Sequence, residues 1–413
     1  MSLFSNKSRN HKNNSVRAKP FYRPLTLLFR QALSAFFYAS LTRWNSFPRW
    51  ALKAHGTIRI AAGAIGMGCI GFPNHPVWEM TTACNLKCRH CHTSGGSRSP
   101  EELTTEEAKK MLREIASINI FRMMVFTGGE PLVRPDIYDL CAYSSSLNLA
   151  PVIATNGTLI TPQTARRLRD CGVLCLAFSL DGSEAESHNR LRGDRSAFQS
   201  TIQGIENWKA LGMPLQINIT AMKENLDEIP AILKLADKYG ASIALMYQLI
   251  PVGRGDGIKE NSLSVEENKE LLEEIYSTQK ELGFIVEPVG APQCFPYLLS
   301  KGKRNPVKDY LGQLLFMGCT AGRGLCYIKP DGDVWPCPFL PLKAGNIKEK
   351  PLNRIWEESE VFTLLRDREN LKGECGKCYY RESCGGCRGR AYALSNDLLS
   401  EDPSCFLNGE QNK

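Results

Sequence analysis

The stretch Cys84-Asn85-Leu86-Lys87-Cys88-Arg89-His90-Cys91 decides how the rest of the chain is interpreted. It follows a short β-like run, Val77-Trp78-Glu79-Met80-Thr81-Thr82, and spaces three cysteines as C-x3-C-x2-C. Three thiolates on one tight loop are suited to hold three corners of a 4Fe–4S cube, because thiolate is the ligand that such clusters use. The fourth iron would then be open to a small molecule. The alternative is a zinc knuckle or a few buried cysteines, although zinc sites usually pair CxxC units around a four-coordinate metal.

Short apolar runs alternate with amphipathic stretches downstream of this loop. Strand-like runs fall at 77–82, 123–126, 151–154, 174–179, 215–221 and 243–250, and helix-like stretches fall at 105–117, 135–147, 162–170, 198–211, 227–239 and 264–282. Thr104 and Glu107 fit a capping box at the start of the first helix. Six β/α repeats predict an α/β fold, a partial (β/α)6 TIM-like barrel over residues 76–283, with its functional groups at the C-terminal strand ends.

Motifs whose residues could bind a ligand follow several of these strands. After the second comes Gly128-Gly129-Glu130, whose glycines permit close approach of the backbone to a ligand and whose carboxylate can accept hydrogen bonds from an ammonium group. Ser179 ends the fourth strand, and Asn218 is a polar residue within the apolar fifth strand. A buried amide needs partners, so Asn218 is a candidate to face a ligand.

Eight further cysteines gather near the C-terminus, after a connecting region at 284–318. They are spaced Cys319-x6-Cys326-x10-Cys337, then Cys375-x2-Cys378-x5-Cys384-x2-Cys387, then Cys405. Asp331-Gly332-Asp333 within the first group predicts a hairpin turn. Eight thiolates are enough for two fully ligated 4Fe–4S clusters. A pair of four-thiolate zinc sites is the alternative.

The cysteine loop, the glycine-rich motif and the C-terminal array together resemble the radical S-adenosylmethionine (SAM) superfamily, in the group with a C-terminal SPASM domain. The resemblance implies that the open iron is chelated by the amino and carboxylate groups of SAM and that the reduced cluster cleaves SAM to a 5′-deoxyadenosyl radical. It therefore implies one 4Fe–4S cluster with an open iron, SAM, and two auxiliary 4Fe–4S clusters. The SPASM domain is expected to span residues 319–413.

The resemblance also implies roles for individual residues. The cluster with the open iron would take Cys84, Cys88 and Cys91; the first auxiliary cluster would take Cys319, Cys326, Cys337 and Cys387; the second would take Cys375, Cys378, Cys384 and Cys405. Residues expected at the SAM site are Gly128, Gly129, Glu130, Ser179, Arg192, Asn218 and Val252. Of these, Glu130 is expected at the SAM amino group, Arg192 at the carboxylate, and the backbone around Val252 at the adenine.

Three longer strings, at 250–255, 336–342 and 384–393, resemble the tetrapyrrole-modifying subgroup of SPASM enzymes. This resemblance implies oxidative decarboxylation or side-chain removal on an iron tetrapyrrole in heme biosynthesis. Substrate propionates would need cationic partners, and Arg254, Arg388 and Arg390 are the candidates. The alternatives are a SPASM-type maturase acting on a peptide or protein, a lipid-directed enzyme, and a non-catalytic iron–sulfur or zinc protein.

The first 75 residues form a basic and apolar leader outside the resemblance. Residues 1–78 contain eleven Lys and Arg and no acid, whereas residues 79–413 carry a net charge of −3. Its apolar stretches are interrupted by charges and fall short of a spanning helix, so we expect either peripheral membrane contact or a helical extension packed on the barrel. Oxygen-labile clusters favour a reducing cytoplasm, and the leader makes association with a membrane the alternative. An electron donor of the ferredoxin or flavodoxin type is expected, and nucleic acid is not.

Overall fold

The structure, a computed structural model, describes residues 75–118, 121, 123–279, 281–300, 306–307, 310 and 318–407. The predicted leader lies outside these residues, apart from His75 at its last position. Within the described part of the chain, no helix is both long and apolar enough to cross a membrane.

A single mixed sheet runs through the described residues, in the order β10-β9-β8-β1-β2-β3-β4-β5-β6-β7. Its strands are β1 (His75–Glu79), β2 (Met123–Thr127), β3 (Ala150–Thr155), β4 (Cys175–Ser179), β5 (Leu215–Ala221), β6 (Ile243–Gln248), β7 (Ile285–Val289), β8 (Leu325–Ile328), β9 (Asp333–Trp335) and β10 (Gly345–Asn346). Strands β8 and β1 to β7 pair in parallel, and β9 and β10 add antiparallel pairs. The sheet does not close, which confirms the predicted partial barrel.

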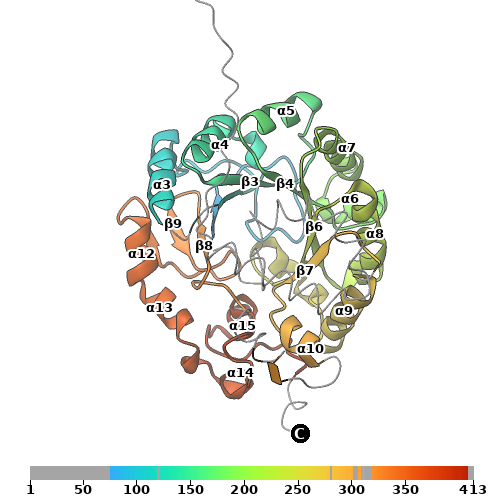
Figure 1. Ribbon diagram of the computed structural model, residues 1–413, viewed down its shortest axis with the longest axis vertical. Helices are drawn as coiled ribbons and strands as arrows, with labels where there is room; N and C mark the ends of the chain where they lie inside the picture. The colour runs from blue at the N-terminus through green and yellow to red at the C-terminus, as the bar shows by residue number, and fades with distance from the viewer. Residues whose placement is uncertain are drawn as a thin grey trace, which may run out of the picture.

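Helices surround this sheet on its outer side (Figure 1). They are α3 (Thr105–Ser117), α4 (Ile137–Ser146), α5 (Pro162–Asp170), α6 (Ala185–Arg192), α7 (Ala197–Lys209), α8 (Ile229–Tyr239), α9 (Val265–Thr278), α10 (Cys294–Ser300), α12 (Leu352–Glu358), α13 (Glu360–Arg366), α14 (Gly373–Lys377) and α15 (Arg388–Ser395). The capping box predicted for the first helix is present, since Thr104 N donates to Glu107 Oε2 at 2.8 Å and Glu107 N donates to Thr104 Oγ1 at 3.3 Å.

Both faces of the parallel strands are buried. Val77, Val125, Val152 and Cys175 are aligned by strand register and face the barrel interior. Their neighbours along the chain, such as Trp78, belong to the larger core that packs beneath the helices. Burial on both sides explains why these strands appear in the sequence as short, nearly continuous apolar runs.

The region after α9 differs from the sequence-based expectation. Residues 284–318 were expected only to connect two domains, yet they contain β7, which pairs in parallel with β6, and α10. Pro288 lies within β7, and a strand with a proline is tolerated here because β7 is an edge strand of the sheet. A separate helix, α6, also precedes the predicted helix at 198–211, which is α7 at Ala197–Lys209.

The cysteine-rich region continues the sheet of the barrel. Strand β8 pairs in parallel with β1, placing Cys326 opposite Pro76, and turns at Gly332 into β9 as the predicted hairpin. This pairing brings the C-terminal cysteines to the side of the barrel on which the Cys84–Cys91 loop begins.

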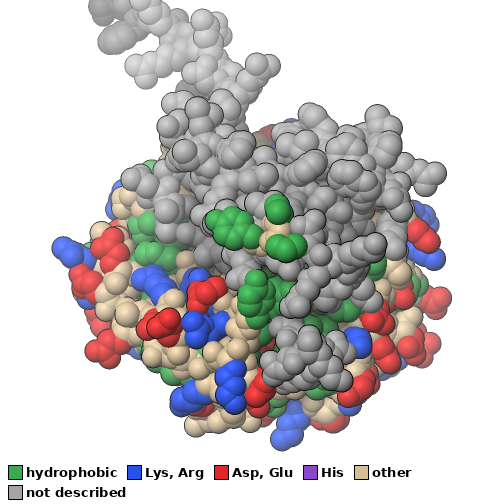
Figure 2. All heavy atoms as spheres, turned by 60° about the horizontal axis from the view of Figure 1, so that its bottom comes forward, with side chains coloured by type: hydrophobic (Ala, Val, Ile, Leu, Met, Phe, Trp, Pro, Cys, Tyr) green, Lys and Arg blue, Asp and Glu red, His purple; other side chains and the backbone are tan. Residues whose placement is uncertain are grey.

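On the face turned forward in Figure 2, acidic and basic side chains lie intermixed.

Candidate active site

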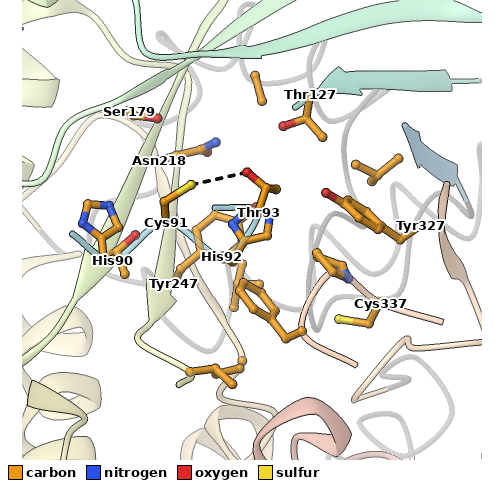
Figure 3. Close-up of a pocket in the computed structure, with 18 of the residues that line it drawn as sticks. His90, Cys91, His92, Thr93, Thr127, Ser179, Asn218, Tyr247, Tyr327 and Cys337 are labelled. Atoms are coloured by element: carbon orange, nitrogen blue, oxygen red, sulfur yellow. Dashed lines mark hydrogen bonds between the residues drawn. The ribbon is translucent and has the colours of Figure 1, made fainter. Parts of the chain in front are cut away.

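A cavity of about 250 Å³ opens at the C-terminal ends of the parallel strands. Figure 3 shows the side chains that surround it, with Ser179 from β4 and Asn218 from β5 on one side, Tyr327 and Cys337 on the other, and Thr127 from β2 above Tyr327. Six cysteines border the cavity, three from each part of the chain: Cys84, Cys88, Cys91, Cys319, Cys337 and Cys387. Loops more than 200 residues apart in sequence therefore face one space.

Arg254 fixes the Cys84–Cys91 loop to the end of β6. Its Nε donates to the carbonyl of Cys88 at 2.8 Å, its Nη1 donates to the carbonyl of Gly95 at 2.7 Å, and its backbone N donates to the carbonyl of Cys91 at 2.9 Å. The proposed role of Arg254 as a partner of substrate carboxylates is therefore not supported by its contacts: its guanidinium braces the cysteine loop.

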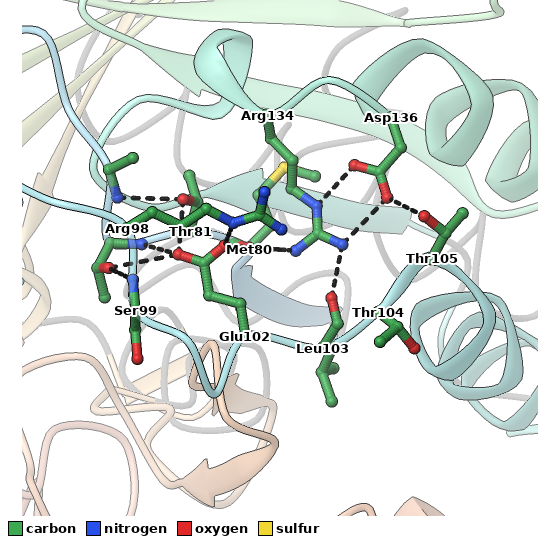
Figure 4. A network of polar contacts seen from close by, with 12 residues as sticks. Met80, Thr81, Arg98, Ser99, Glu102, Leu103, Thr104, Thr105, Arg134 and Asp136 are labelled. Atoms are coloured by element: carbon green, nitrogen blue, oxygen red, sulfur yellow. Dashed lines mark hydrogen bonds and ion pairs between the residues drawn. The ribbon is translucent and has the colours of Figure 1, made fainter.

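The chain that enters the loop is held from the outer side by Glu102 (Figure 4). Its Oε1 accepts hydrogen bonds from Thr81 Oγ1 at 2.8 Å and from the backbone N of Thr82 at 2.9 Å. Glu102 is buried, and its Oε2 pairs with Arg98 Nε at 3.0 Å. The backbone just before Cys84 therefore has fixed partners.

Arg134 adds a second brace in the same network (Figure 4). It is 3% exposed and donates to the carbonyls of Met80 and Leu103, each at 2.7 Å, while its Nε pairs with Asp136 at 2.7 Å. These bonds connect the end of β1, the segment before α3 and the start of α4. Sequence reasoning missed this cluster because two of the partners of Arg134 are backbone carbonyls, which carry no sequence signal.

The Gly128-Gly129-Glu130 motif contacts the cysteine loop through its backbone. Gly129 N donates to the carbonyl of Thr81, and Glu130 N donates to the carbonyl of Ala83, both at 2.8 Å. A Cβ on Gly129 would lie 2.2 Å from the Ala83 carbonyl oxygen. Only glycine permits this approach.

The Glu130 carboxylate does not line the cavity. Oε1 accepts from Thr155 Oγ1 at 2.8 Å and from Leu132 N at 3.2 Å, and Oε2 accepts from Asn156 N at 2.8 Å. Burial raises the pKa of Glu130 to about 7, although these hydrogen bonds oppose the shift. The carboxylate thus holds the ends of β2 and β3 together, and its contact with the SAM amino group stays a prediction.

Arg192 lines the cavity and is held by a buried carboxylate. Its Nη2 lies 2.5 Å from Asp181 Oδ2, and its Nη1 lies 3.7 Å from Cys88 Sγ. Asp181 also pairs with His90 Nε2 at 3.1 Å and accepts from Thr220 N at 2.8 Å. Although burial opposes it, the charge of Arg192 and then that of His90 lower the pKa of Asp181 below its usual range. Asp181 is thus the shared partner of Arg192 and His90.

Ser179 and Asn218 lie opposite each other in adjacent strands and both line the cavity. Asn218 Oδ1 accepts from Gln216 Nε2 at 2.7 Å, which fixes the orientation of its amide. The predicted residue Val252 lies at the N-cap of a short 3-10 segment (Gly253–Asn261) and does not line the cavity, whereas its neighbours Ile250 and Arg254 do.

Seven of the eight C-terminal cysteines influence one another within two groups, which are Cys319, Cys337 and Cys387, and Cys375, Cys378, Cys384 and Cys405. Burial, and then the neighbouring thiols of Cys319 and Cys387, raise the pKa of Cys337 well above its usual value. Burial, followed by effects that include Cys375 and Cys378, raises the pKa of Cys405 to about 12. The groups touch where Cys319 N donates to the carbonyl of Cys384 at 3.0 Å. Cys326 is fully buried on β8 and does not border the cavity.

Two arginines expected at the substrate lie within this cysteine-rich region instead. Arg388 is 4% exposed, donates to the carbonyls of Leu398 and Ser400, and lies 3.8 Å from Cys375 Sγ. Arg390 is 3% exposed and pairs with Asp402 at 3.2 Å. Their expected role as partners of substrate carboxylates is therefore not supported, because their donors are engaged inside the domain.

The donor set fits iron–sulfur clusters. The cysteines are free thiols, and burial raises the pKa of Cys84 to about 11, of Cys326 to about 12 and of Cys387 to about 11. Thiols in such surroundings ionise when a cationic metal binds them. Among the described side chains, no group of three or more His, Cys, Asp or Glu is close enough together to hold a single metal ion. A four-iron cube needs no such group, because each of its thiolates binds a different iron.

Aromatic residues that sequence reasoning missed form one wall of the cavity. They are His92, Tyr247, Tyr327 and Phe339. Tyr327 donates its phenol proton to Glu79 at 2.9 Å, and burial raises the pKa of Tyr327 well above its usual value. Burial, and then Lys329 and His90, lower the pKa of His92 to about 4, so its ring is neutral at physiological pH. The only sequence signal that could have placed His92 at the cavity is its position directly after Cys91.

Comparison with known proteins agrees with this geometry. A model of the radical SAM superfamily matches residues 78–236, and a model of the SPASM iron–sulfur cluster-binding domain matches residues 319–379. The AdoMet-dependent heme synthase of Methanosarcina barkeri is 41% identical over 339 residues, covering 81% of this chain and 96% of that protein. The AdoMet-dependent heme synthase of Nitratidesulfovibrio vulgaris is 36% identical over 333 residues, covering 79% of this chain and 90% of that protein.

A solved structure shows the same fold. SuiB of Streptococcus suis, bound to S-adenosylmethionine, matches with a TM-score of 0.63 at 20% identity, covering 81% of this chain and 78% of that one. The expected cofactors, a 4Fe–4S cluster, SAM and auxiliary iron–sulfur clusters, follow from the two matched domains. The chain therefore belongs to the radical SAM superfamily and is a SAM-dependent iron–sulfur enzyme with a C-terminal SPASM domain.

Proposed function

We propose that this enzyme converts propionate side chains of an iron tetrapyrrole, of the Fe-coproporphyrin III type, into vinyl groups in heme biosynthesis. The observation that carries this proposal is the 41% identity to a protein named AdoMet-dependent heme synthase, matched over 96% of its length. In each conversion the substrate side chain would lose one hydrogen atom from its β-carbon, then carbon dioxide and one electron.

We further propose how the thiols are divided. Cys84, Cys88 and Cys91 would hold the cluster with the open iron. The first auxiliary cluster would take Cys319, Cys326, Cys337 and Cys387, and the second would take Cys375, Cys378, Cys384 and Cys405. The mutual influence of the Cys337, Cys319 and Cys387 thiols, and that of Cys405 with Cys375 and Cys378, support this division.

When bound, SAM and its cluster supply hydrogen abstraction, and the auxiliary clusters supply an acceptor for the electron. The chain's own residues would position these groups. Arg192, oriented by Asp181, offers a guanidinium fork to a carboxylate. Ser179 and Asn218 present a hydroxyl and an amide at adjacent strand ends. Gly128 and Gly129 bring their backbone close to the loop.

The aromatic lining of the cavity suits a flat, largely apolar substrate. Tyr247, Tyr327 and Phe339 belong to this lining, and Tyr247 and Phe339 lie with ring centroids 6.4 Å apart. Aromatic surfaces of this kind commonly line small-molecule pockets. Cys337 and Cys387 border the same cavity, so the electron released from a substrate in it would have only a short path to the first auxiliary cluster.

The test is turnover under strict anaerobic conditions. We expect purified protein with SAM, dithionite and Fe-coproporphyrin III to yield porphyrins with vinyl groups, detected by mass spectrometry as loss of carbon dioxide and two hydrogens per converted side chain. The Cys88→Ala variant is the control and should give neither product nor 5′-deoxyadenosine.

Formation of 5′-deoxyadenosine with Fe-coproporphyrin III left unchanged would overturn the substrate assignment. Conversion of a peptide encoded beside this gene would then favour the maturase alternative. We propose a low-potential ferredoxin or flavodoxin as the physiological reductant in the cytoplasm. We also propose that residues 1–75 contact a membrane. Vesicle flotation of the protein with and without these residues would test the membrane contact.

A further inference from the structure

The imidazole of His92 stands in the cavity between the two sets of cysteines. His92 directly follows Cys91 in the chain. The centroid of its ring lies 5.3 Å from the ring centroid of Phe339, which comes two residues after Cys337. Its ring also lies 6.4 Å from that of Tyr327. Figure 3 shows His92 between the side chains of Cys91 and Tyr327. The ring therefore has aromatic neighbours on one side and the cavity on the other.

Other histidines around the cavity are engaged differently. His90 Nε2 lies 3.1 Å from Asp181, and its Nδ1 is buried without a hydrogen-bond partner among the described residues. His75 takes part in other interactions on β1, at the start of the strand. His92 is half-buried, and no hydrogen bond or ion pair joins its ring to another described residue. Its ring nitrogens are thus available to a molecule in the cavity.

We propose that His92 is an axial ligand to the iron of the tetrapyrrole substrate. This inference rests on the proposed function. A lone pair of the imidazole would form a coordinate bond to the iron, replacing water or another weak ligand, with no change in oxidation state. Imidazole is the most common protein ligand of heme-type iron.

The other potential iron ligands along the cavity wall are less suitable. The phenol of Tyr327 already donates to Glu79 at 2.9 Å. The cysteines that border the cavity belong to the two cluster sites. A bond from His92 to the iron would centre the macrocycle between those sites, and the flanking rings of Phe339 and Tyr327 offer apolar contact. Peripheral side chains would then extend toward the strand ends that carry Ser179 and Asn218.

This ligand would serve selection and placement of the substrate, and would take no part in bond cleavage. Because only a metallated ring gains the coordinate bond, binding should favour the iron form over metal-free coproporphyrin III. We expect about a tenfold or larger preference in Kd, which corresponds to about 1.4 kcal/mol.

The experiment uses cluster-loaded protein, with ferric coproporphyrin III as the ligand. We expect the wild-type complex to show the Soret band and electron paramagnetic resonance signal of histidine-ligated iron. His92→Ala should lose this signature, bind ferric coproporphyrin III about tenfold more weakly and bind metal-free coproporphyrin III unchanged. Added imidazole should restore the signature. His75→Ala, a second histidine on the cavity wall, is the matched control and should keep the wild-type spectrum.

The outcomes separate this inference from the proposed function. If the wild type binds and converts Fe-coproporphyrin III while His92→Ala keeps the same spectrum, His92 is not the ligand and the proposed function stands. An equal loss of affinity for the iron and metal-free rings would instead show that His92 contacts the periphery, and would also overturn axial ligation. If the wild type neither binds nor converts the iron tetrapyrrole, both proposals fail together. Retention of iron and sulfide in His92→Ala ensures that the clusters are intact.

Discussion

Arg192 and Asp181 form a buried ion pair at 2.5 Å, directly beside Cys88. Asp181 is fully buried, and it also pairs with His90 at 3.1 Å. Two segments far from the Cys84–Cys91 loop in sequence, the turn after β4 and α6, therefore determine where a guanidinium stands relative to the Cys88 thiol. The pair connects the stability of the barrel with the geometry of the cavity at the strand ends.

Asp181→Asn should destabilise the protein by about 3–5 kcal/mol, because removing one partner leaves the Arg192 charge buried without compensation. The measurement is anaerobic chemical unfolding of cluster-loaded protein. Glu358→Gln, which breaks an exposed pair with Arg354, is the control and should cost less than about 1 kcal/mol. Similar losses in the two variants would contradict the importance of the buried pair.

Glu130 should make stability depend on pH near neutrality. Its pKa is raised from 4.5 to about 7 by burial, so the folded state holds this proton more tightly than the unfolded state. The corresponding stability is fully present below pH about 4.5 and is lost as the pH rises through about 7. Between pH 5.5 and 8 we expect a loss of roughly 2 kcal/mol from this group.

Glu130→Gln should remove that part of the pH dependence, whatever its effect on stability at a single pH. The measurement is the free energy of unfolding at pH 5.5 and pH 8 for both proteins. Glu107→Gln is the matched control: the hydrogen bonds of the capping box lower the pKa of Glu107, so it is ionised throughout this range. An unchanged pH dependence in Glu130→Gln would contradict the raised pKa.

The barrel was predictable because its signals are local. Strands buried on both faces appear as short apolar runs, and the Thr104–Glu107 capping box marks a helix start within four residues. The three cysteines of the loop are likewise close in sequence. Strand β7 was missed since Pro288 argues against a strand unless its place at the sheet edge is known.

The roles of the arginines could not be predicted, because an arginine looks the same in sequence whether it faces a substrate or a carbonyl. Arg254 donates to the carbonyl of Cys88, which lies 166 residues earlier. Arg390 pairs with Asp402, and Arg388 donates to the carbonyls of Leu398 and Ser400. Only the folded chain shows that these donors are already used. For the same reason, the contacts of Arg134 and the position of His92 at the cavity could not be predicted from the sequence.

Gly129→Ala should remove the cluster held by the Cys84–Cys91 loop while leaving the auxiliary clusters in place. The added Cβ would meet the backbone of Ala83 at 2.2 Å, and the loop would have to move away. Iron analysis should fall from about twelve to about eight atoms per chain, with loss of SAM cleavage. Gly257→Ala is the control, since a Cβ there meets nothing within 4 Å. Full iron content in Gly129→Ala would show that the loop tolerates the shift.

Arg368 should tune the reduction potentials of the auxiliary clusters. It is 4% exposed, and its Nη2 donates to the carbonyl of Cys319 at 2.7 Å while a Cβ on Gly385 would lie 2.1 Å from its Nη1. Its charge thus stands beside Cys319 of one cysteine group and next to the Cys384–Gly385 segment of the other. A buried cation near a cluster stabilises the reduced, more negative state.

Arg368→Met should therefore lower one or both auxiliary potentials, by on the order of 60 mV for each 1.4 kcal/mol of lost interaction with a one-electron couple. The measurement is a redox titration followed by electron paramagnetic resonance, on variants that keep their full iron content. Arg368→Lys retains the charge and should shift the potentials less, and Arg354→Met, at an exposed ion pair, should shift neither. If Arg368→Met and Arg368→Lys shift the potentials equally, the effect arises from altered packing around Cys319 and not from the charge. A graded response, with methionine larger than lysine, would place the electrostatic control of the electron path in this one side chain.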